Sequence, residues 1–254
     1  MTRNLKTMIK IGSVELGSKP NIVLAVDEFN YNLTEAYSNG VSIIEIRIDQ
    51  FSNTNFDFVR DQLKKFSSLN LPLIATIRPK NEKGSWKKDE SKRKELFLQI
   101  IDLVDAIDIE LTSFEINRYV ATACKQAGKT LIVSNHEFNK TPEISELEIQ
   151  MSEAKRLGAD IFKLACFANN QDDVVRLLGF IKDNKENGVI GISMGSHGTI
   201  SRLIATLFGS LLTYTSITPC YGQLPLQELV DMSRLFYPAF NQDLIISRQL
   251  MEYI

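Results

Sequence analysis

Short apolar runs alternate with longer amphipathic segments along almost the whole chain, and this alternation restricts the possible fold more than any other feature. The eight runs are Ile22–Val26, Val41–Asp49, Leu73–Arg78, Ala106–Leu111, Thr130–His136, Ile161–Phe167, Val189–Met194 and Leu211–Ile217. The segments between them have helical spacing, as at Leu96, Ile100 and Val104 before the fourth run. Strands that alternate with helices form right-handed βαβ units around a parallel sheet.

Eight such repeats in 254 residues match the size of a (β/α)8 TIM barrel. We therefore predict a single α/β barrel domain over residues 1–254, because no linker, low-complexity tract or second domain interrupts the repeats. The stretch Met8–Leu16, which ends at Gly17, precedes the first repeat. It predicts an N-terminal β-hairpin that closes the barrel floor.

Charged residues lie inside several predicted strands. Glu45, Arg47 and Asp49 alternate with isoleucines, so a strand would place all three on one face. In a parallel barrel the isoleucines must face the helices, and the charges then point into the barrel. The same pattern recurs at Asp108, Glu110 and Arg78. Because buried charges need partners and barrel active sites lie at the carboxyl ends of the strands, this pattern favours an enzyme.

Lys163 lies inside the sixth run and His136 ends the fifth. Burial of an ammonium group is costly unless the group is paired or loses its proton. A neutral amine could attack a ketone and form an imine, and a histidine on a neighbouring strand could transfer protons. A lysine that extends to a strand end and a histidine that caps a turn would fit these two residues equally well.

Two loops have ligand-binding character. The loop Ser193–Arg202 follows the seventh run, and its glycines allow a ligand close to the backbone, while Arg202 could hold a carboxylate. A glycine-rich barrel loop could instead bind phosphate. No GxGxxG or GxxxxGK[ST] motif is present, so nucleotide cofactors have no support. Gln223 follows the eighth run in the turn Pro219–Gln223 and is weak evidence by itself.

Composition excludes several classes of protein. The formal net charge of −2, from 29 basic and 31 acidic residues, argues against a nucleic-acid partner. Three cysteines without CxxC spacing predict free thiols in a reducing compartment. The first residues lack the apolar core of a signal peptide, and no apolar stretch reaches membrane-spanning length. We therefore predict a cytoplasmic protein with no membrane partner.

Seven short motifs follow one another at the predicted strand ends. They are Glu45-Ile46-Arg47-Ile48-Asp49, Thr76-Ile77-Arg78 with Glu82 and Gly84, Asp108-Ile109-Glu110, Ser134-Asn135-His136-Glu137-Phe138, Lys163-Leu164-Ala165, Ser193-Met194-Gly195 with Gly198, Ser201 and Arg202, and Gly222-Gln223. Together they resemble the type I 3-dehydroquinate dehydratase family. The resemblance implies a homodimeric (β/α)8 lyase without metal or cofactor. Its reaction converts the small-molecule substrate 3-dehydroquinate into 3-dehydroshikimate and water, in the shikimate pathway of aromatic amino-acid biosynthesis.

The resemblance also implies roles for individual residues. Lys163 would form the imine (Schiff base), His136 would move the protons, and Glu82 would orient this histidine. The residues matching the family's substrate contacts are Glu45, Arg47 and Arg78 for the ring hydroxyls, Arg202 and Gln223 for the carboxylate, and Met194 as an apolar wall. Asp49, Asp108 and Glu110 would be partners of the arginines and the lysine behind them.

Two departures from the family pattern and two alternatives remain. Pro219 stands where many members have a serine, and Ser216 and Thr218 nearby do not match that spacing. The extension Asn241–Ile254 is longer than the family needs, and we expect a final helix that packs on the barrel or on a dimer partner. A class I aldolase would also be a barrel with an imine-forming lysine. An inactive barrel that binds a shikimate-pathway acid is the second alternative.

Overall fold

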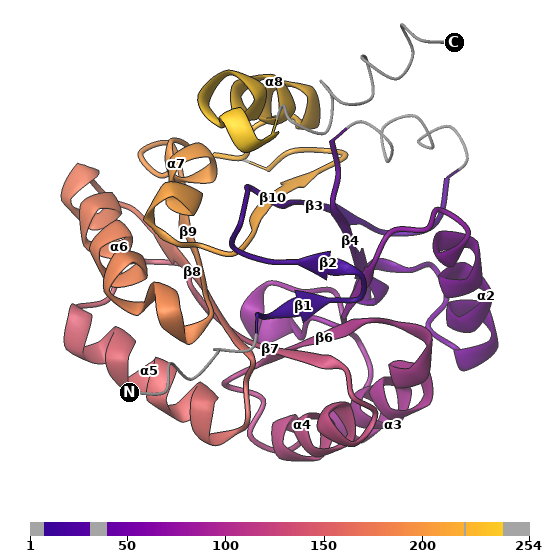
Figure 1. Cartoon of the computed structure of the whole chain (residues 1–254). Helices are drawn as coiled ribbons and strands as arrows, with labels where there is room; N and C mark the ends of the chain where they lie inside the picture. The colour runs from indigo at the N-terminus through magenta and orange to yellow at the C-terminus, as the bar shows by residue number, and fades with distance from the viewer. Residues whose placement is uncertain (1–7, 31–39, 221, 241–254) are drawn as a thin grey trace, which may run out of the picture.

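The computed structural model describes residues 8–30, 40–220 and 222–240 and forms a (β/α)8 barrel (Figure 1). Its barrel strands are β3 (Ile22–Val26), β4 (Ile43–Arg47), β5 (Leu73–Thr76), β6 (Ala106–Glu110), β7 (Thr130–Glu137), β8 (Ile161–Phe167), β9 (Val189–Met194) and β10 (Thr213–Ser216). Seven of the eight predicted runs contain one of these strands, and the run Thr130–His136 ends one residue before β7 does, which confirms the predicted fold class.

The strands are parallel and follow the order β10-β3-β4-β5-β6-β7-β8-β9. The backbone amide of Leu211, just before β10, donates a hydrogen bond of 2.9 Å to the carbonyl of Val189 in β9. This bond joins the first and last strands of the order, so the sheet closes on itself.

Within the described residues, a helix follows each barrel strand from β4 onward, and these helices surround the barrel (Figure 1). They are α2 (Phe56–Ser67), α3 (Glu90–Ile100), α4 (Asn117–Gln126), α5 (Ile144–Arg156), α6 (Gln171–Asn184), α7 (Ser201–Phe208) and α8 (Leu226–Phe236). Short 3-10 turns are η2 (Ile48–Gln50), η3 (Lys80–Glu82), η4 (Ile101–Leu103) and η5 (Lys185–Asn187). Local signals start several helices, such as the Asp89 side chain that accepts a hydrogen bond from Lys92 N–H at α3. The predicted helix at Asn241–Ile254 lies outside the described residues.

An antiparallel hairpin covers the amino-terminal end of the barrel, as predicted. It consists of β1 (Lys10–Ile11) and β2 (Val14–Glu15), which cross the centre of the barrel in Figure 1. Ile11 and the following Leu16 are buried against the first inward residues of the barrel strands. The hairpin therefore closes the floor with apolar side chains.

Side chains inside the barrel form three layers, because every second strand residue points inward. The floor layer is apolar and contains Val23, Ile43, Ile74, Ala106, Ile132, Ile161, Ile190 and Leu212. The middle layer is polar and contains Glu45, Thr76, Asp108, Ser134, Lys163 and Tyr214. The top layer opens at the carboxyl ends of the strands. The layering thus places buried charge between a dry floor and an open mouth.

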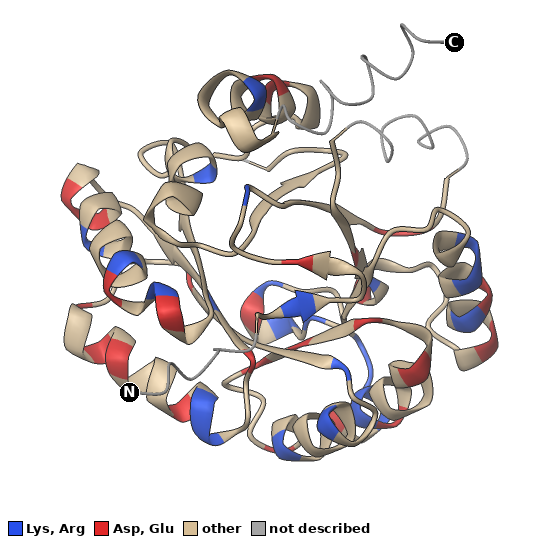
Figure 2. Ribbon diagram, viewed as in Figure 1, with Lys and Arg blue, Asp and Glu red and all other residues tan. Residues whose placement is uncertain are grey.

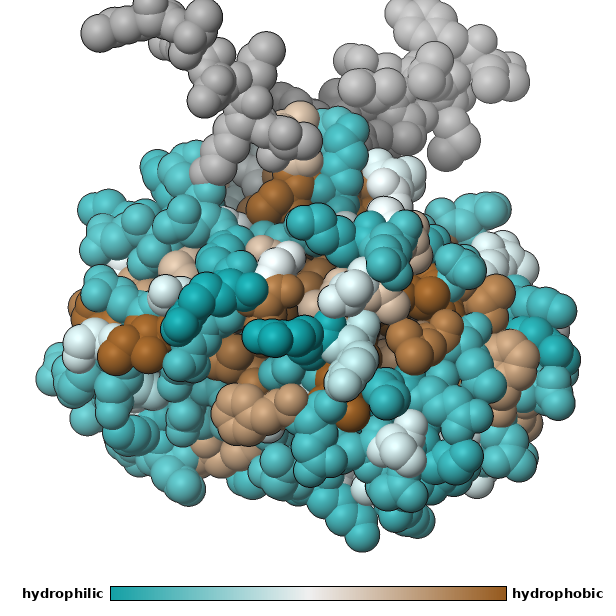
Figure 3. Space-filling model, turned by 90° about the horizontal axis from the view of Figure 1, so that it is seen from below, coloured by the Kyte–Doolittle hydropathy of each residue, from teal (hydrophilic) through white to brown (hydrophobic). Residues whose placement is uncertain are grey.

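The outer surface is polar and carries both signs of charge. Lysine, arginine, aspartate and glutamate are interspersed on the outer helices in Figure 2. The face seen from below in Figure 3 is mostly hydrophilic, with hydrophobic residues in small separate groups. Across the described ranges, no helix is long and apolar enough to cross a membrane.

Candidate active site

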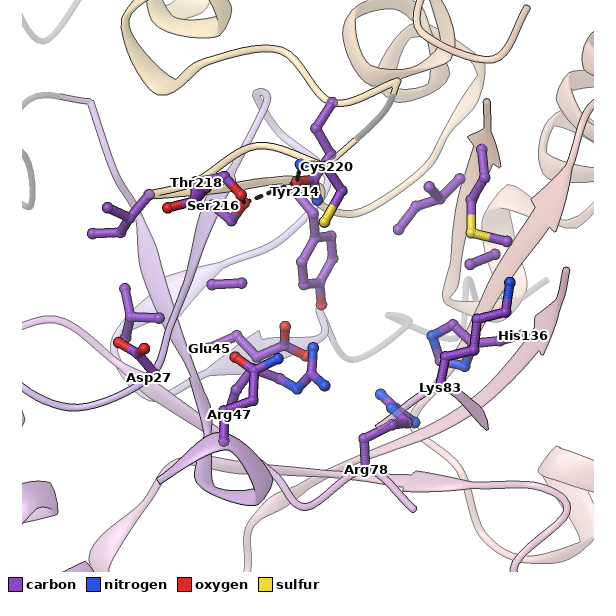
Figure 4. Close-up of a pocket in the computed structure, with 18 of the residues that line it drawn as sticks. Asp27, Glu45, Arg47, Arg78, Lys83, His136, Tyr214, Ser216, Thr218 and Cys220 are labelled. Atoms are coloured by element: carbon purple, nitrogen blue, oxygen red, sulfur yellow. Dashed lines mark hydrogen bonds between the residues drawn. The ribbon is translucent and has the colours of Figure 1, made fainter. Parts of the chain in front are cut away.

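A cavity of about 1150 Å³ opens at the carboxyl ends of the barrel strands (Figure 4). All nine residues predicted to act on or bind substrate line it: Lys163, His136, Glu82, Glu45, Arg47, Arg78, Met194, Arg202 and Gln223. The three residues predicted to support them, Asp49, Asp108 and Glu110, are buried behind the lining. The structure therefore brings the whole predicted set to one end of the barrel.

Lys163 lies in the middle of β8 and is only 4% exposed. Its Nζ is 2.9 Å from Asp108 Oδ2 and 3.1 Å from Glu45 Oε1, and it lies 4.2 Å from the centre of the Tyr214 ring. Burial acts to lower the pKa of Lys163, but the two carboxylates outweigh burial and raise it. The resting side chain is therefore an ammonium. Of the two alternatives for a buried lysine, a paired charge or a lost proton, the resting structure therefore has the first.

The two carboxylates that hold Lys163 are themselves kept ionised. Burial disfavours their charged forms, but Lys163 lowers the pKa of Glu45, and Arg78 together with Lys163 lowers that of Asp108. Thr76 Oγ1 also donates a hydrogen bond of 2.9 Å to Glu45. Lys163 therefore lies between two permanent negative charges.

Arg78 joins this cluster to a second buried arginine. It contacts Asp108 at 3.0 Å and Glu110 at 2.7 Å, and Glu110 is also 2.7 Å from Arg93. Arg93 is fully buried and donates a further hydrogen bond of 2.8 Å to the Ile77 carbonyl. The cluster thus links Glu45, Asp108 and Glu110 to Lys163, Arg78 and Arg93, and Arg93 also pairs with Glu90 at 2.6 Å.

His136 and Glu82 form a second polar pair in the cavity. His136 Nδ1 is 2.7 Å from Glu82 Oε2, and Thr112 donates a hydrogen bond to the other oxygen of this carboxylate. If Nδ1 carries the proton toward Glu82, the lone pair of Nε2 is free to accept a proton. Glu82 ends the turn η3. The chain then passes so close to Arg78 that a Cβ on Gly84 would lie 2.0 Å from the Arg78 carbonyl oxygen, so only glycine fits there.

Burial, reinforced by the nearby cations Arg78 and Lys163, lowers the pKa of His136 well below its usual 6.5. The imidazole is therefore neutral at pH 7 and remains so as the pH falls through 6.5. We expect the acidic limb of the pH profile of kcat/KM to lie clearly below pH 6.5. An inflection at or above 6.5 in steady-state assays would contradict this assignment.

Arg202 lies in the first turn of α7, is 6% exposed, and faces the cavity. Burial lowers its pKa to about 10. Its Nε has no hydrogen-bond partner, and no carboxylate within the described part of the chain pairs with it. A buried cation without a counter-charge is a binding site for an anionic group.

Gln223 lies across the same end of the cavity in the loop after β10. Its Oε1 accepts hydrogen bonds of 2.9 Å from Ser216 Oγ and from the Cys220 amide. Gly222 brings this loop against the loop after β9, because a Cβ there would lie 2.5 Å from the Gly195 carbonyl oxygen. Within the described residues, the side-chain amide nitrogen of Gln223 has no protein partner and can donate to a ligand.

Asp49 binds Arg47, but the two residues do not share a strand face as the alternation predicted. Strand β4 ends at Arg47, and Asp49 lies in the turn η2. The chain folds back there, so Asp49 binds the Arg47 guanidinium at 3.0 and 2.9 Å and accepts a third bond from the Ser85 amide. The expectation that Asp49 continues the strand is wrong, whereas the expected contact with an arginine is present.

Three polar residues of the site were missed in the sequence analysis. Arg93 is on α3, at a core-facing position that helical spacing from Leu96 and Phe97 could have indicated. Tyr214 points inward on β10, as the two-residue period would predict from the pocket-lining Ser216. Thr112 follows β6, and no pattern in the sequence identifies it as a partner of Glu82.

The fold and the mouth of the barrel define a (β/α)8 enzyme with a lysine amine inside its active-site cavity. A model of the type I 3-dehydroquinase family matches residues 23–238. The chain belongs to this family.

Similar proteins cover most of the chain. 3-Dehydroquinate dehydratase from Aquifex aeolicus is 39% identical over 220 residues, which are 85% of this chain and 98% of that protein. The corresponding protein from Methanosarcina barkeri is 36% identical over 88% of this chain and 96% of its own length. The crystal structure of type I 3-dehydroquinate dehydratase from Clostridium difficile with covalently modified comenic acid has a TM-score of 0.85 at 29% identity, covering 92% of this chain and 99% of that one.

Proposed function

We propose that this protein is a 3-dehydroquinate dehydratase that forms an imine between Lys163 and the C3 ketone of its substrate. The observation that carries the proposal is the shared cavity: the Lys163 amine and the His136–Glu82 pair line it together. An imine would make the C2 proton acidic, and a neutral histidine would remove it. Loss of the C1 hydroxyl as water, followed by hydrolysis of the imine, then releases 3-dehydroshikimate, an intermediate of aromatic amino-acid biosynthesis, and restores the Lys163 amine.

The protonated state of Lys163 adds a step to this mechanism. A proton must leave the ammonium before the amine can attack the ketone. His136 is neutral, faces the same cavity, and lies close enough for Lys163 to influence its pKa. We assign it as the acceptor of this proton once substrate is bound. His136 would return the proton to the carbinolamine hydroxyl, which leaves as water when the imine forms, so that the histidine is neutral again when the C2 proton is removed. The imine is positively charged when protonated, so Glu45 and Asp108 would stabilise it as they stabilise the ammonium.

The remaining lining residues would orient the substrate. Arg202 and the free amide of Gln223 would bind its carboxylate, while Glu45, Arg47 and Arg78 would bind its ring hydroxyls. Met194 would form an apolar wall. Pro219 is not among the lining residues, whereas Ser216 and Thr218 on either side of Ile217 are, so these hydroxyls are the candidates for the missing serine contact.

The direct test is turnover of 3-dehydroquinate, followed by the ultraviolet absorbance of the conjugated enone product. Borohydride reduction during turnover should trap the substrate on the protein. Cleavage of a carbon–carbon bond instead of dehydration would indicate the aldolase alternative. Binding of dehydroquinate without product or trapped imine would indicate an inactive barrel.

Arg202 should control substrate binding more than any other cation at the rim. We expect Arg202→Ala to raise KM strongly, with a loss of about 2–5 kcal/mol in transition-state binding, because the carboxylate of the bound substrate would lose its charged partner. Arg202→Lys should be intermediate, because lysine cannot make two parallel hydrogen bonds. Gln223→Ala should act in the same direction but more weakly. A folded Arg202→Ala protein with normal KM would move the carboxylate to Arg47 or Arg78.

We also propose that the protein works in the cytoplasm as a homodimer. The three cysteines are free in the structure, two of them buried, and free thiols are typical of proteins from a reducing compartment. The dimer follows the family resemblance alone. Sedimentation velocity of the full chain would test it, and a single monomeric species at micromolar concentration would contradict it.

A further inference from the structure

We propose that Cys220 is a modification site for peroxides, and that its oxidised anion occupies the binding site at Arg202. The inference rests on the proposed function, in which Arg202 binds the substrate carboxylate. Cys220 lies in the loop after β10, is exposed, and lines the cavity. Figure 4 shows its sulfur pointing into the cavity. The thiol is therefore open to solvent on the same side as the substrate.

Arg202 supplies the second half of this site. Only 6% of Arg202 is exposed, and its Nε has no hydrogen-bond partner. Cys220 and Arg202 line the same cavity, and Gly222 packs the loop of Cys220 against Gly195 in the loop that leads into α7 and Arg202. A sulfur oxyanion at Cys220 would give this guanidinium the counter-charge that it lacks.

The other two cysteines serve as internal controls. Cys124 and Cys166 are buried in the apolar core around the barrel. Burial raises the pKa of Cys124 to about 12 and raises that of Cys166 as well. Buried thiols with raised pKa are poor nucleophiles, so peroxide should leave both of them reduced.

The chemistry is a two-electron oxidation of the thiol by hydrogen peroxide. The sulfur attacks one peroxide oxygen, the O–O bond breaks, and the second oxygen leaves with the thiol proton as water. The product is a sulfenic acid, which small thiols reduce again. A second peroxide would add another oxygen in the same way and give a sulfinic acid, which they do not reduce. Either oxyanion would exclude the substrate carboxylate from Arg202.

Peroxide treatment of the full-length protein tests the site. We expect peptide mass spectrometry to find added oxygen at Cys220 and none at Cys124 or Cys166. Turnover should fall in proportion to the oxidised fraction and recover with dithiothreitol from the sulfenic form. Cys220→Ser keeps the backbone amide that binds Gln223 and should keep its activity under the same treatment. Equal inactivation of Cys220→Ser, or full activity of the oxidised wild type, would overturn the proposal.

A test without turnover separates this inference from the proposed function. Cys220→Asp places a permanent carboxylate near Arg202 and should raise the melting temperature by about 2–4 °C. The same substitution in an Arg202→Gln background should give no increase. In turnover assays Cys220→Asp should raise KM about 10–100-fold. Absence of the Arg202-dependent thermal shift would overturn the pairing, whereas absence of turnover in wild type would overturn only the proposed function.

Discussion

Lys163→Ala should abolish turnover of 3-dehydroquinate, with a loss on the order of 10⁴-fold or more, as is usual for a covalent nucleophile. No other lysine among the cavity-lining residues is buried, since Lys83 is exposed at the rim. Borohydride reduction with substrate should add mass to the peptide that contains Lys163. Trapping on another lysine, or none, would refute the imine at Lys163.

The variant also has a structural cost that needs a control. Removing Lys163 leaves Glu45 and Asp108 buried without their shared cation, which should cost about 3–5 kcal/mol of stability. Lys163→Arg keeps a positive charge in the cluster but cannot form the imine. We expect it to be inactive and more stable to denaturant than Lys163→Ala, so that loss of chemistry can be distinguished from loss of fold by circular dichroism.

His136→Ala should lower the rate of dehydration by about 10²–10⁴-fold, the usual contribution of a positioned general base. Some imine should still form, because Lys163 remains, so borohydride trapping should persist at a reduced rate. The measurement is steady-state turnover combined with mass spectrometry of the trapped species. The expected combination is low turnover with detectable imine.

His197 provides the matched control for this prediction. It is the other histidine of the chain, is exposed on the loop after β9, and does not line the cavity. His197→Ala should therefore change turnover little. A larger loss in His197→Ala than in His136→Ala would show that the base has been misassigned.

The fold could be predicted from the sequence because the spacing of apolar residues and the length of each apolar run are local properties of the chain. Each apolar run was placed within a few residues, and the inward direction of Glu45 and Asp108 followed from alternation in a barrel. The error at Asp49 arose because a turn ended the strand early. Isoleucine at 48 suits a strand and a buried turn equally well, so no local signal marks that boundary.

The charge state of the site could not be predicted, because it depends on distances between strands. Lys163 is an ammonium only because Asp108 and Glu45 lie about one hydrogen bond away, and their positions are fixed by the register of three different strands. Arg93 was missed for the same reason. Its partner Glu110 is on the adjacent strand β6, whereas helical spacing indicates only which side of α3 faces inward.

The buried cluster of carboxylates and cations also limits how this barrel can diverge. A neutral substitution at Glu45, Asp108, Lys163 or Arg78 removes an ion-pair partner from at least one buried charge. Loss of Asp108, for example, would expose Arg78 and Lys163 to each other, and tolerance would require a second change at one of them. Substitutions at these positions should therefore be accepted in pairs. A change of catalytic chemistry in this scaffold would begin at cavity residues outside the cluster, such as Met194 and Arg202.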